Sequence, residues 1–205
     1  MINFAGNHGI KDSDLFDVID LDAASKMVAQ IDKAIRAIPD YPHEGQVYRD
    51  FTTLWNDRQA FNASIMAMYI LGRNGVEDII DKIVAIESRG WIYGAILADR
   101  MNLPLVVARK HKMLPAKTAT QIYGGEDGDL VQIHRDAIHK GDNVLLIDDI
   151  IITGKSTLAC ARCVETLGGK VVRIVALADL DEKKGKTRLR GNGYKAVTAL
   201  SYPGT

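Results

Sequence analysis

The feature that most constrains this chain is an apolar segment followed directly by two carboxylates and a turn of small residues. Residues 144–147 predict a buried strand, Asp148 and Asp149 come next, and residues 153–157 lead into a helical pattern. Backbone N–H groups at the start of a helix attract anions, and Gly154 allows a ligand to approach the backbone closely. The segment therefore predicts a strand, a turn and a helix, with a phosphate site at the turn.

Two kinds of chemistry compete for this segment. The run Gly154-Lys155-Ser156 matches the end of a nucleoside-triphosphate loop, but that motif needs a glycine where this chain has Asp149. Adjacent ionised carboxylates accept hydrogen bonds from vicinal hydroxyls or bind a metal ion. A ribose 5-phosphate carries both hydroxyls and a phosphate and fits the whole arrangement, whereas an acidic helix cap needs only one acceptor.

The rest of the chain alternates between strand and helix patterns. Short apolar segments predict buried strands at residues 83–86, 105–108, 144–147 and 171–178, and helical patterns occupy residues 59–71, 91–101 and 157–167. This alternation is typical of an α/β fold with a parallel sheet covered by helices on both faces. Ligands of such sheets bind beyond the carboxyl ends of the strands, which is where Asp148 and Asp149 are expected.

Two segments depart from this alternation. Aspartates cluster near the N-terminus, and residues 27–38 have helical spacing that Pro39 is expected to stop. Glycines interrupt any regular pattern over residues 116–132, which we expect to be a mobile loop.

Composition limits the classes of partner. The 205 residues carry 26 basic and 26 acidic side chains, so no net charge draws the chain to nucleic acid or acidic lipid. Residues 59–72 form an uncharged stretch that is too short to span a bilayer. The N-terminus lacks a signal-peptide pattern, and Cys160 and Cys163 are expected to pack inside a helix rather than form a disulfide or metal site. We therefore expect a cytoplasmic location, with no nucleic-acid or membrane partner.

The segment around Asp148 and Asp149 resembles the phosphoribosyl pyrophosphate signature of the type I phosphoribosyltransferases. Other segments are similar to the adenine phosphoribosyltransferases within that family: residues 39–42 and 45–50 resemble the base-binding segment, 87–91 the pyrophosphate loop, and 109–115 the start of the flexible loop. The resemblance implies a twisted, mostly parallel sheet flanked by helices with a small N-terminal hood. It also implies a phosphoribosyltransferase domain over residues 39–205, preceded by an acidic extension and helix over residues 1–38.

The resemblance further implies a role for each matching residue. Asp148 and Asp149 would hold the ribose hydroxyls, and Glu126 would act near the base nitrogen. Tyr48 would stack on adenine, with the backbone of Val47 and Arg49 reading its edge. The remaining substrate-binding residues are those for pyrophosphate, namely Arg89, Arg109, Lys110 and Lys112, and those for the 5-phosphate, namely Thr153, Gly154, Lys155, Ser156 and Thr157. Mg²⁺ would be held mainly by the substrate, with Asp148 or Asp149 as a protein ligand, and the enzyme would be a homodimer.

Three positions depart from the family's pattern and bear on which base is used. Met113 replaces a lysine, Asp127 a tyrosine, and Lys155 a glycine. Residues 108–112 resemble xanthine phosphoribosyltransferases, and residues 153–155 resemble the hypoxanthine-guanine enzymes. The latter carry an aspartate as proton acceptor where this chain has Ile152, which cannot take a proton.

A different class of function is a purine-responsive regulator that keeps the fold and binds DNA. Such a protein needs a basic DNA-binding element, but the N-terminal region is acidic, and no helix-turn-helix pattern with clustered Lys or Arg occurs in the sequence. The enzyme is therefore the favoured interpretation.

Overall fold

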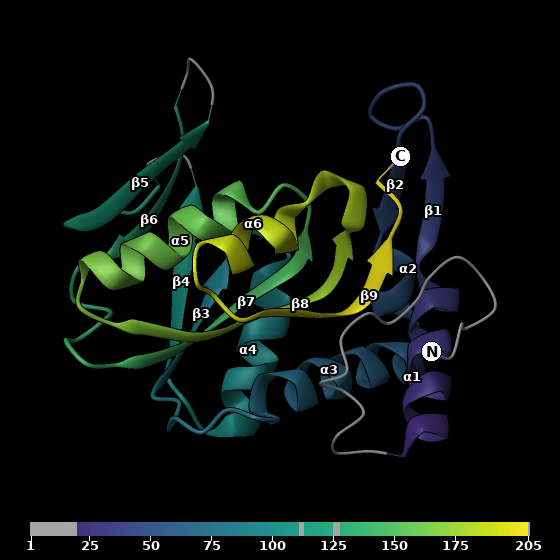
Figure 1. Cartoon of the computed structure of the whole chain (residues 1–205), viewed down its shortest axis with the longest axis horizontal. Coiled ribbons are helices and arrows are strands. Elements are labelled where there is room, and N and C mark those ends of the chain that lie inside the picture. The colour runs from purple at the N-terminus through teal and green to yellow at the C-terminus, as the bar shows by residue number, and fades with distance from the viewer. Residues whose placement is uncertain (1–19, 111–112, 125–127, 205) are drawn as a thin grey trace.

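A seven-stranded sheet forms the centre of the molecule, seen in a computed structural model that describes residues 20–110, 113–124 and 128–204 (Figure 1). Its strands run in the order β5-β6-β4-β3-β7-β8-β9. Neighbours from β4 to β9 are parallel, whereas β6 pairs antiparallel with both β4 and β5 at one edge. The bounds are β3 (Lys82–Ile86), β4 (Leu105–Lys110), β5 (Thr118–Gly124), β6 (Asp129–His134), β7 (Asn143–Ile151), β8 (Lys170–Leu180) and β9 (Ala196–Tyr202). The predicted mostly parallel sheet is confirmed.

Helices cover both faces of the sheet, as the alternating pattern predicts (Figure 1). One face carries α3 (Arg58–Arg73) and α4 (Gly90–Met101), and the other carries α5 (Lys155–Thr166) and α6 (Gly185–Gly191). Alternate side chains of β7 serve the two cores: Leu145 and Ile147 pack on the α3 and α4 side, and Leu146 on the α5 side. No helix within the described ranges is long and apolar enough to cross a membrane.

The interior of α5 confirms the interpretation of the two cysteines. Cys160 and Cys163 are fully buried free thiols in the core beneath this helix. Burial raises the pKa of both thiols, that of Cys163 to about 11, so neither is an ionised nucleophile at neutral pH.

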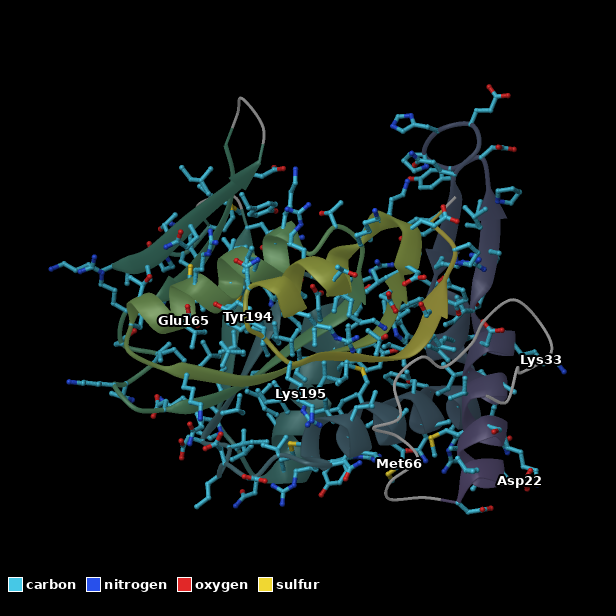
Figure 2. The ribbon with its side chains drawn as sticks, in the orientation of Figure 1. Asp22, Lys33, Met66, Glu165, Tyr194 and Lys195 are labelled. Atoms are coloured by element: carbon cyan, nitrogen blue, oxygen red, sulfur yellow. The ribbon has the colours of Figure 1, made fainter. Side chains whose placement is uncertain are left out.

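The N-terminal helix differs from the helix predicted over residues 27–38. Helix α1 (Leu21–Ala34) begins earlier and ends before Pro39, because Ile35 is already extended and β1 (Arg36–Pro39) follows. One side of α1 packs on α3 through Val28 and Ile31, whereas Asp22 and Lys33 project away from the core (Figure 2). Pairing of β1 with β2 outweighs the helical spacing of this segment.

Strands β1 and β2 (Val47–Asp50) form a separate antiparallel hairpin, the small hood that the resemblance implies. It stands beside the carboxyl end of β9 and is followed by the short helix α2 (Thr52–Asn56) (Figure 1).

Most of residues 116–132 forms regular structure, so the expected glycine-rich loop is wrong for this part. Strands β5 and β6 pair there, with Ala119 and Val131 buried against α5. The Gln132 side chain donates to the hydroxyls of Thr118 and Thr120, at 3.1 and 3.0 Å, and ties the two strands together. Cross-strand contacts and the core beneath them decide the conformation despite the nearby glycines.

Candidate active site

The carboxylate pair lies buried near the carboxyl end of β7. The Asp149 N–H donates to Oδ1 of Asp148 at 3.0 Å, and the buried Thr157 hydroxyl donates to Oδ2 of Asp148 at 3.2 Å. Burial, and then the charge of Asp149, raises the pKa of Asp148 well above its ordinary value. Burial also raises the pKa of Asp149, against the opposing charge of Arg89. Hydroxyl donors or a cation from a ligand would stabilise both carboxylates in their ionised form.

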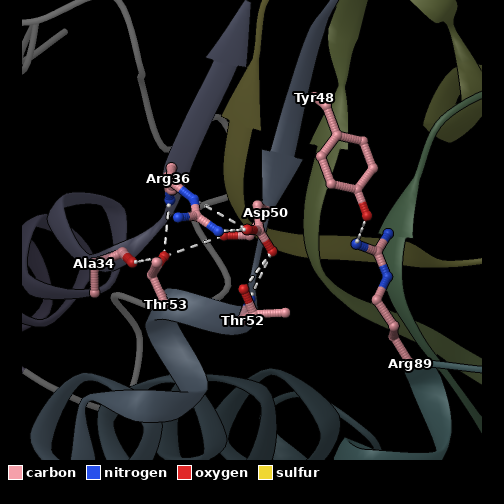
Figure 3. Close-up of polar contacts among 7 residues, drawn as sticks. All are labelled: Ala34, Arg36, Tyr48, Asp50, Thr52, Thr53 and Arg89. Atoms are coloured by element: carbon pink, nitrogen blue, oxygen red, sulfur yellow. Dashed lines mark hydrogen bonds and ion pairs between the residues drawn. The ribbon is translucent and has the colours of Figure 1, made fainter. Parts of the chain in front are cut away.

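Arg89 joins the carboxylate pair to the hood. Its Nε lies 2.6 Å from Oδ2 of Asp149, and its Nη1 donates to the Tyr48 hydroxyl at 3.1 Å (Figure 3). The guanidinium also lies 5.2 Å from the centre of the Phe51 ring. The strand end that carries Asp149 and the hairpin that carries Tyr48 are thus linked through one side chain.

Gly90 explains how Arg89 comes so close to β7. A Cβ at Gly90 would lie 3.1 Å from the Ile147 carbonyl oxygen and 3.2 Å from the Asp148 Cα. Both neighbours are backbone atoms, so any larger residue would push the start of α4 away from β7 by a few tenths of an ångström, and glycine favours the close approach.

The hood presents aromatic side chains on this side of the sheet. The rings of Tyr41 and Tyr48 meet edge to face at 5.3 Å between centroids. The Arg49 guanidinium lies 4.1 Å from the centre of the Tyr202 ring at the end of β9, and so ties the hood to the main sheet. Val47, the third residue predicted in the base-binding segment, opens β2 and is half-buried.

Asp50 holds the lower end of the hood, where β2 meets α2, in place. Its carboxylate accepts from Arg36 Nε at 3.1 Å and from the Thr52 backbone and hydroxyl at 2.9 and 2.7 Å (Figure 3). These contacts, with the Thr52 N–H the largest influence, lower the pKa of Asp50 to about 2. Thr53 adds a second anchor, since its hydroxyl donates to the Ala34 carbonyl at 2.7 Å.

The ends of β3 and β4 form a second cluster around Glu87. The Glu87 carboxylate accepts the Lys110 N–H at 2.6 Å and lies 3.4 Å from Arg109 Nη2. Arg109 also lies 5.5 Å from the centre of the Trp91 ring, while the Trp91 N–H donates to the carbonyls of Ala85 and Ala108. Glu87 lies within the motif at residues 87–91 but had no predicted role; in the structure it contacts the Arg109 side chain and the Lys110 backbone.

The phosphate turn, residues 153–156, has the predicted position at the start of α5. Gly154 has φ of +69°, a left-handed conformation that favours glycine, and its Cβ position would lie 2.7 Å from the Gly185 carbonyl oxygen. Thr153 and Lys155 are exposed and Ser156 is half-buried, so their side chains and N–H groups line the surface of the turn. Thr157 instead points inward to Asp148, which makes it a support for the carboxylate pair.

Comparison with known proteins identifies the family. Residues 56–198 match the model of the phosphoribosyl transferase domain. An adenine phosphoribosyltransferase of Actinobacillus succinogenes is 39% identical over 88% of this chain and 99% of its own length. The chain belongs to the adenine phosphoribosyltransferase family.

Other members of the adenine phosphoribosyltransferase family extend the comparison. The enzyme of Nitrosomonas europaea is 43% identical over 84% of this chain and 98% of its own. The crystal structure of the Saccharomyces cerevisiae enzyme, complexed with an imino-altritol bisphosphate and adenine, has a TM-score of 0.79 and 32% identity, and covers 86% of this chain and 99% of that one.

Two of the residues assigned from the adenine phosphoribosyltransferase pattern, Glu126 and Lys112, lie outside the described residues, as does the departure at Asp127. A side chain that the sequence reasoning missed is Tyr123 near the tip of β5. Burial raises its pKa, and the charges of Asp129 and Asp148 contribute. Tyr123 therefore lies within electrostatic range of Asp148, a proximity that only the tertiary structure reveals.

The carboxylates fit a magnesium ion that is bound mainly by substrate. Within the described ranges, no group of three or more His, Cys, Asp or Glu side chains is placed to hold a metal ion. Mg²⁺ commonly takes one or two protein carboxylates and completes its shell with substrate phosphates and water. Asp148 and Asp149 supply that number of carboxylates at the strand end.

Proposed function

We propose that this chain forms AMP and pyrophosphate from adenine and phosphoribosyl pyrophosphate at the carboxyl ends of β3 and β7. The observation that carries the proposal is the continuous link from Asp149 through Arg89 to Tyr48. This link connects a carboxylate pair suited to ribose hydroxyls with an aromatic ring suited to a purine, so that sugar and base are held side by side.

The hood takes the base in this proposal. Tyr48 stacks on adenine, and the backbone of Val47 and Arg49 reads its edge. The Arg89 hydrogen bond fixes the hydroxyl end of the Tyr48 ring, and the Arg49 contact with Tyr202 keeps the strand in place. A ring that is already oriented loses little conformational entropy when the base binds.

In this proposal the carboxyl ends of the strands bind the ribose, its 5-phosphate and its pyrophosphate. The phosphate turn binds the 5-phosphate, while Asp148 and Asp149 accept hydrogen bonds from the ribose hydroxyls. Arg89, Arg109 and Lys110 bind pyrophosphate. Glu87 holds the Arg109 side chain and the Lys110 backbone in position. We assign Lys112 to the same anion from the resemblance.

In the reaction, the bond from the ribose C1 to a pyrophosphate oxygen breaks, a bond from C1 to a base nitrogen forms, and the base releases one proton to the solvent. Positive charge develops on the sugar ring, and the buried carboxylates stabilise it. The cations at Arg89 and Arg109 stabilise the departing pyrophosphate. Bound Mg²⁺ would neutralise charge on pyrophosphate, with Asp148 or Asp149 as its protein ligand. Glu126 is our proposed partner for the base nitrogen.

The alternative bases are less well supported. Ile152, in the place of the aspartate of hypoxanthine-guanine enzymes, is an exposed aliphatic side chain at the phosphate turn. It offers no proton acceptor to an oxopurine.

The test is pyrophosphate release by the purified protein with phosphoribosyl pyrophosphate and Mg²⁺, using adenine, hypoxanthine, guanine and xanthine separately. We expect release with adenine alone and AMP as the nucleotide product. Turnover of an oxopurine instead would contradict the base assignment, and turnover of none would contradict the enzyme assignment.

We also propose a cytoplasmic homodimer. Leu105 and Val107 are partly exposed apolar residues of β4 that, with Leu114, line a hollow of about 320 Å³ close to Arg109. A second copy of this chain would cover that apolar surface. Light scattering should give twice the chain mass, and Val107→Asp should give the chain mass. The free, buried thiols of Cys160 and Cys163 suit a reducing compartment.

A further inference from the structure

A closed ring of three buried polar side chains lies behind the phosphate turn. Asp179 on β8, Thr198 on β9 and Lys186 on α6 are 1%, 3% and 6% exposed. The Lys186 ammonium lies 3.1 Å from Oδ1 of Asp179 and donates to the Thr198 hydroxyl at 3.0 Å. The Thr198 hydroxyl donates in turn to the same Asp179 oxygen at 2.9 Å. These contacts join the three side chains into one ring of polar interactions.

Stability alone does not account for this ring. A buried ion pair contributes little net stability compared with apolar side chains of the same size, whereas its geometry is strict. Helix α6 has seven residues, all described, and Leu189 is its one buried apolar side chain. Lys186 and Leu189 anchor this helix in the core, and Arg190 adds hydrogen bonds to the Ala196 carbonyl on β9.

The position of α6 determines the shape of the phosphate turn. A Cβ at Gly185, the residue next to Lys186, would lie 2.3 Å from the Ile152 carbonyl oxygen and 2.8 Å from the Gly154 nitrogen. Arg188, one helical turn further on, donates from Nε to the Thr153 carbonyl at 2.9 Å. Helix α6 therefore packs directly against the phosphate turn.

We infer that Lys186 is a positioning residue for the phosphoribosyl substrate, because the ring with Asp179 and Thr198 holds α6 against the phosphate turn. The inference rests on the proposed function, in which that turn binds the 5-phosphate. A small shift of α6 would misdirect the N–H groups of residues 153–156, and misplacements of about 1 Å are sufficient to weaken a preorganised site strongly. The base site, on the hood, would be unaffected.

The experiment compares Lys186→Met with Lys183→Met, a matched control at an exposed lysine that lies outside the ring. For Lys186→Met we expect the Michaelis constant for phosphoribosyl pyrophosphate to rise about tenfold or more, while that for adenine changes less than about twofold. Titration calorimetry with ribose 5-phosphate should show a loss of affinity of similar size. The Lys183→Met protein should match the wild type in every measurement.

A second variant covers the case in which Lys186→Met does not fold. Thr198→Val keeps the volume of the side chain and removes only the hydroxyl, and we expect it to weaken ribose 5-phosphate binding about threefold. Unchanged affinity for ribose 5-phosphate in a folded variant, or equal rises in both Michaelis constants, would overturn the inference. Calorimetry needs no turnover, so a wild type that binds ribose 5-phosphate but converts no adenine would refute the proposed reaction alone.

Discussion

Replacing Arg89 with methionine removes the charge that links the two halves of the site and keeps most of the side-chain volume. Removing one partner of a fully buried ion pair costs about 3–5 kcal/mol, because the other charge stays buried without compensation. Asp149 is 9% exposed but the Arg89 side chain is 26% exposed, so water screens part of the interaction and we expect a loss of about 2 kcal/mol.

The loss should depend on pH. Arg89 opposes the rise that burial causes in the pKa of Asp149, so this pKa should rise further in the variant. A carboxyl group whose folded pKa exceeds its unfolded value favours folding at low pH, and this contribution disappears as the pH rises through the folded pKa. The destabilisation by Arg89→Met should therefore be larger at about pH 8 than at about pH 5.

Urea unfolding at both pH values measures this effect, and Arg89→Met/Asp149→Asn is the matched control. The double variant has no unpaired buried carboxylate, so most of the lost stability should return, whereas kcat/KM for phosphoribosyl pyrophosphate should stay about 30-fold or more below wild type. Equal destabilisation at the two pH values, or a double variant less stable than Arg89→Met, would refute the reasoning.

Three further predictions follow from the site. Tyr48→Ala should raise the Michaelis constant for adenine about tenfold in steady-state assays, whereas Tyr48→Phe, which keeps the ring, should change it much less; equal effects would exclude stacking. Asp50→Asn should destabilise the protein at neutral pH, as measured by urea unfolding. The difference from wild type should shrink as the pH falls from about 4 to about 2, because Asp50, whose pKa is lowered, loses its stabilising charge over this range. A difference that does not vary with pH would count against this prediction. Gly90→Ala should lower the stability measured by thermal unfolding by about 1–3 kcal/mol and slow turnover by displacing Asp148. The control Gly191→Ala, whose Cβ would meet nothing within 4 Å, should change neither quantity. A fully active Gly90→Ala variant would contradict the close approach.

Much of the fold could be predicted because the parallel strands are buried on both faces. Continuous apolar segments mark β3, β4, β7 and β8, and the intervening helices have clear periodicity. The resemblance implies a small N-terminal hood, but the sequence pattern predicts neither its strand β1 nor the β5–β6 hairpin. Residues 36–39 carry a helix-like pattern and β5 ends at glycine, so their pairing depends on partners distant in sequence or on the core beneath them.

Some features of the candidate active site could likewise be predicted from the sequence, and others could not. Asp148, Asp149 and the phosphate turn lie close together in the sequence. A strand followed by carboxylates and the start of a helix can therefore be recognised without knowledge of tertiary contacts. The inward direction of the Thr157 side chain could not be predicted from the sequence, because a hydroxyl at a turn can point toward a ligand or toward the preceding strand. The hydrogen bond to Asp148 shows which orientation the fold selects.

The strand, turn and helix that carry the chemistry, and the family to which they point, could be recognised without the structure because the residues of that motif are neighbours in the chain. The fold brings Arg89 to Asp149 and Tyr48. It also places Glu87 against the Lys110 backbone, and Lys186 against Asp179 behind the phosphate turn. These contacts join different strands and helices, most of them far apart in sequence, so they form only when the chain is folded. Charge and hydrogen-bonding capacity are properties of a residue type, but which partner satisfies them depends on how the sheet brings its strand ends together.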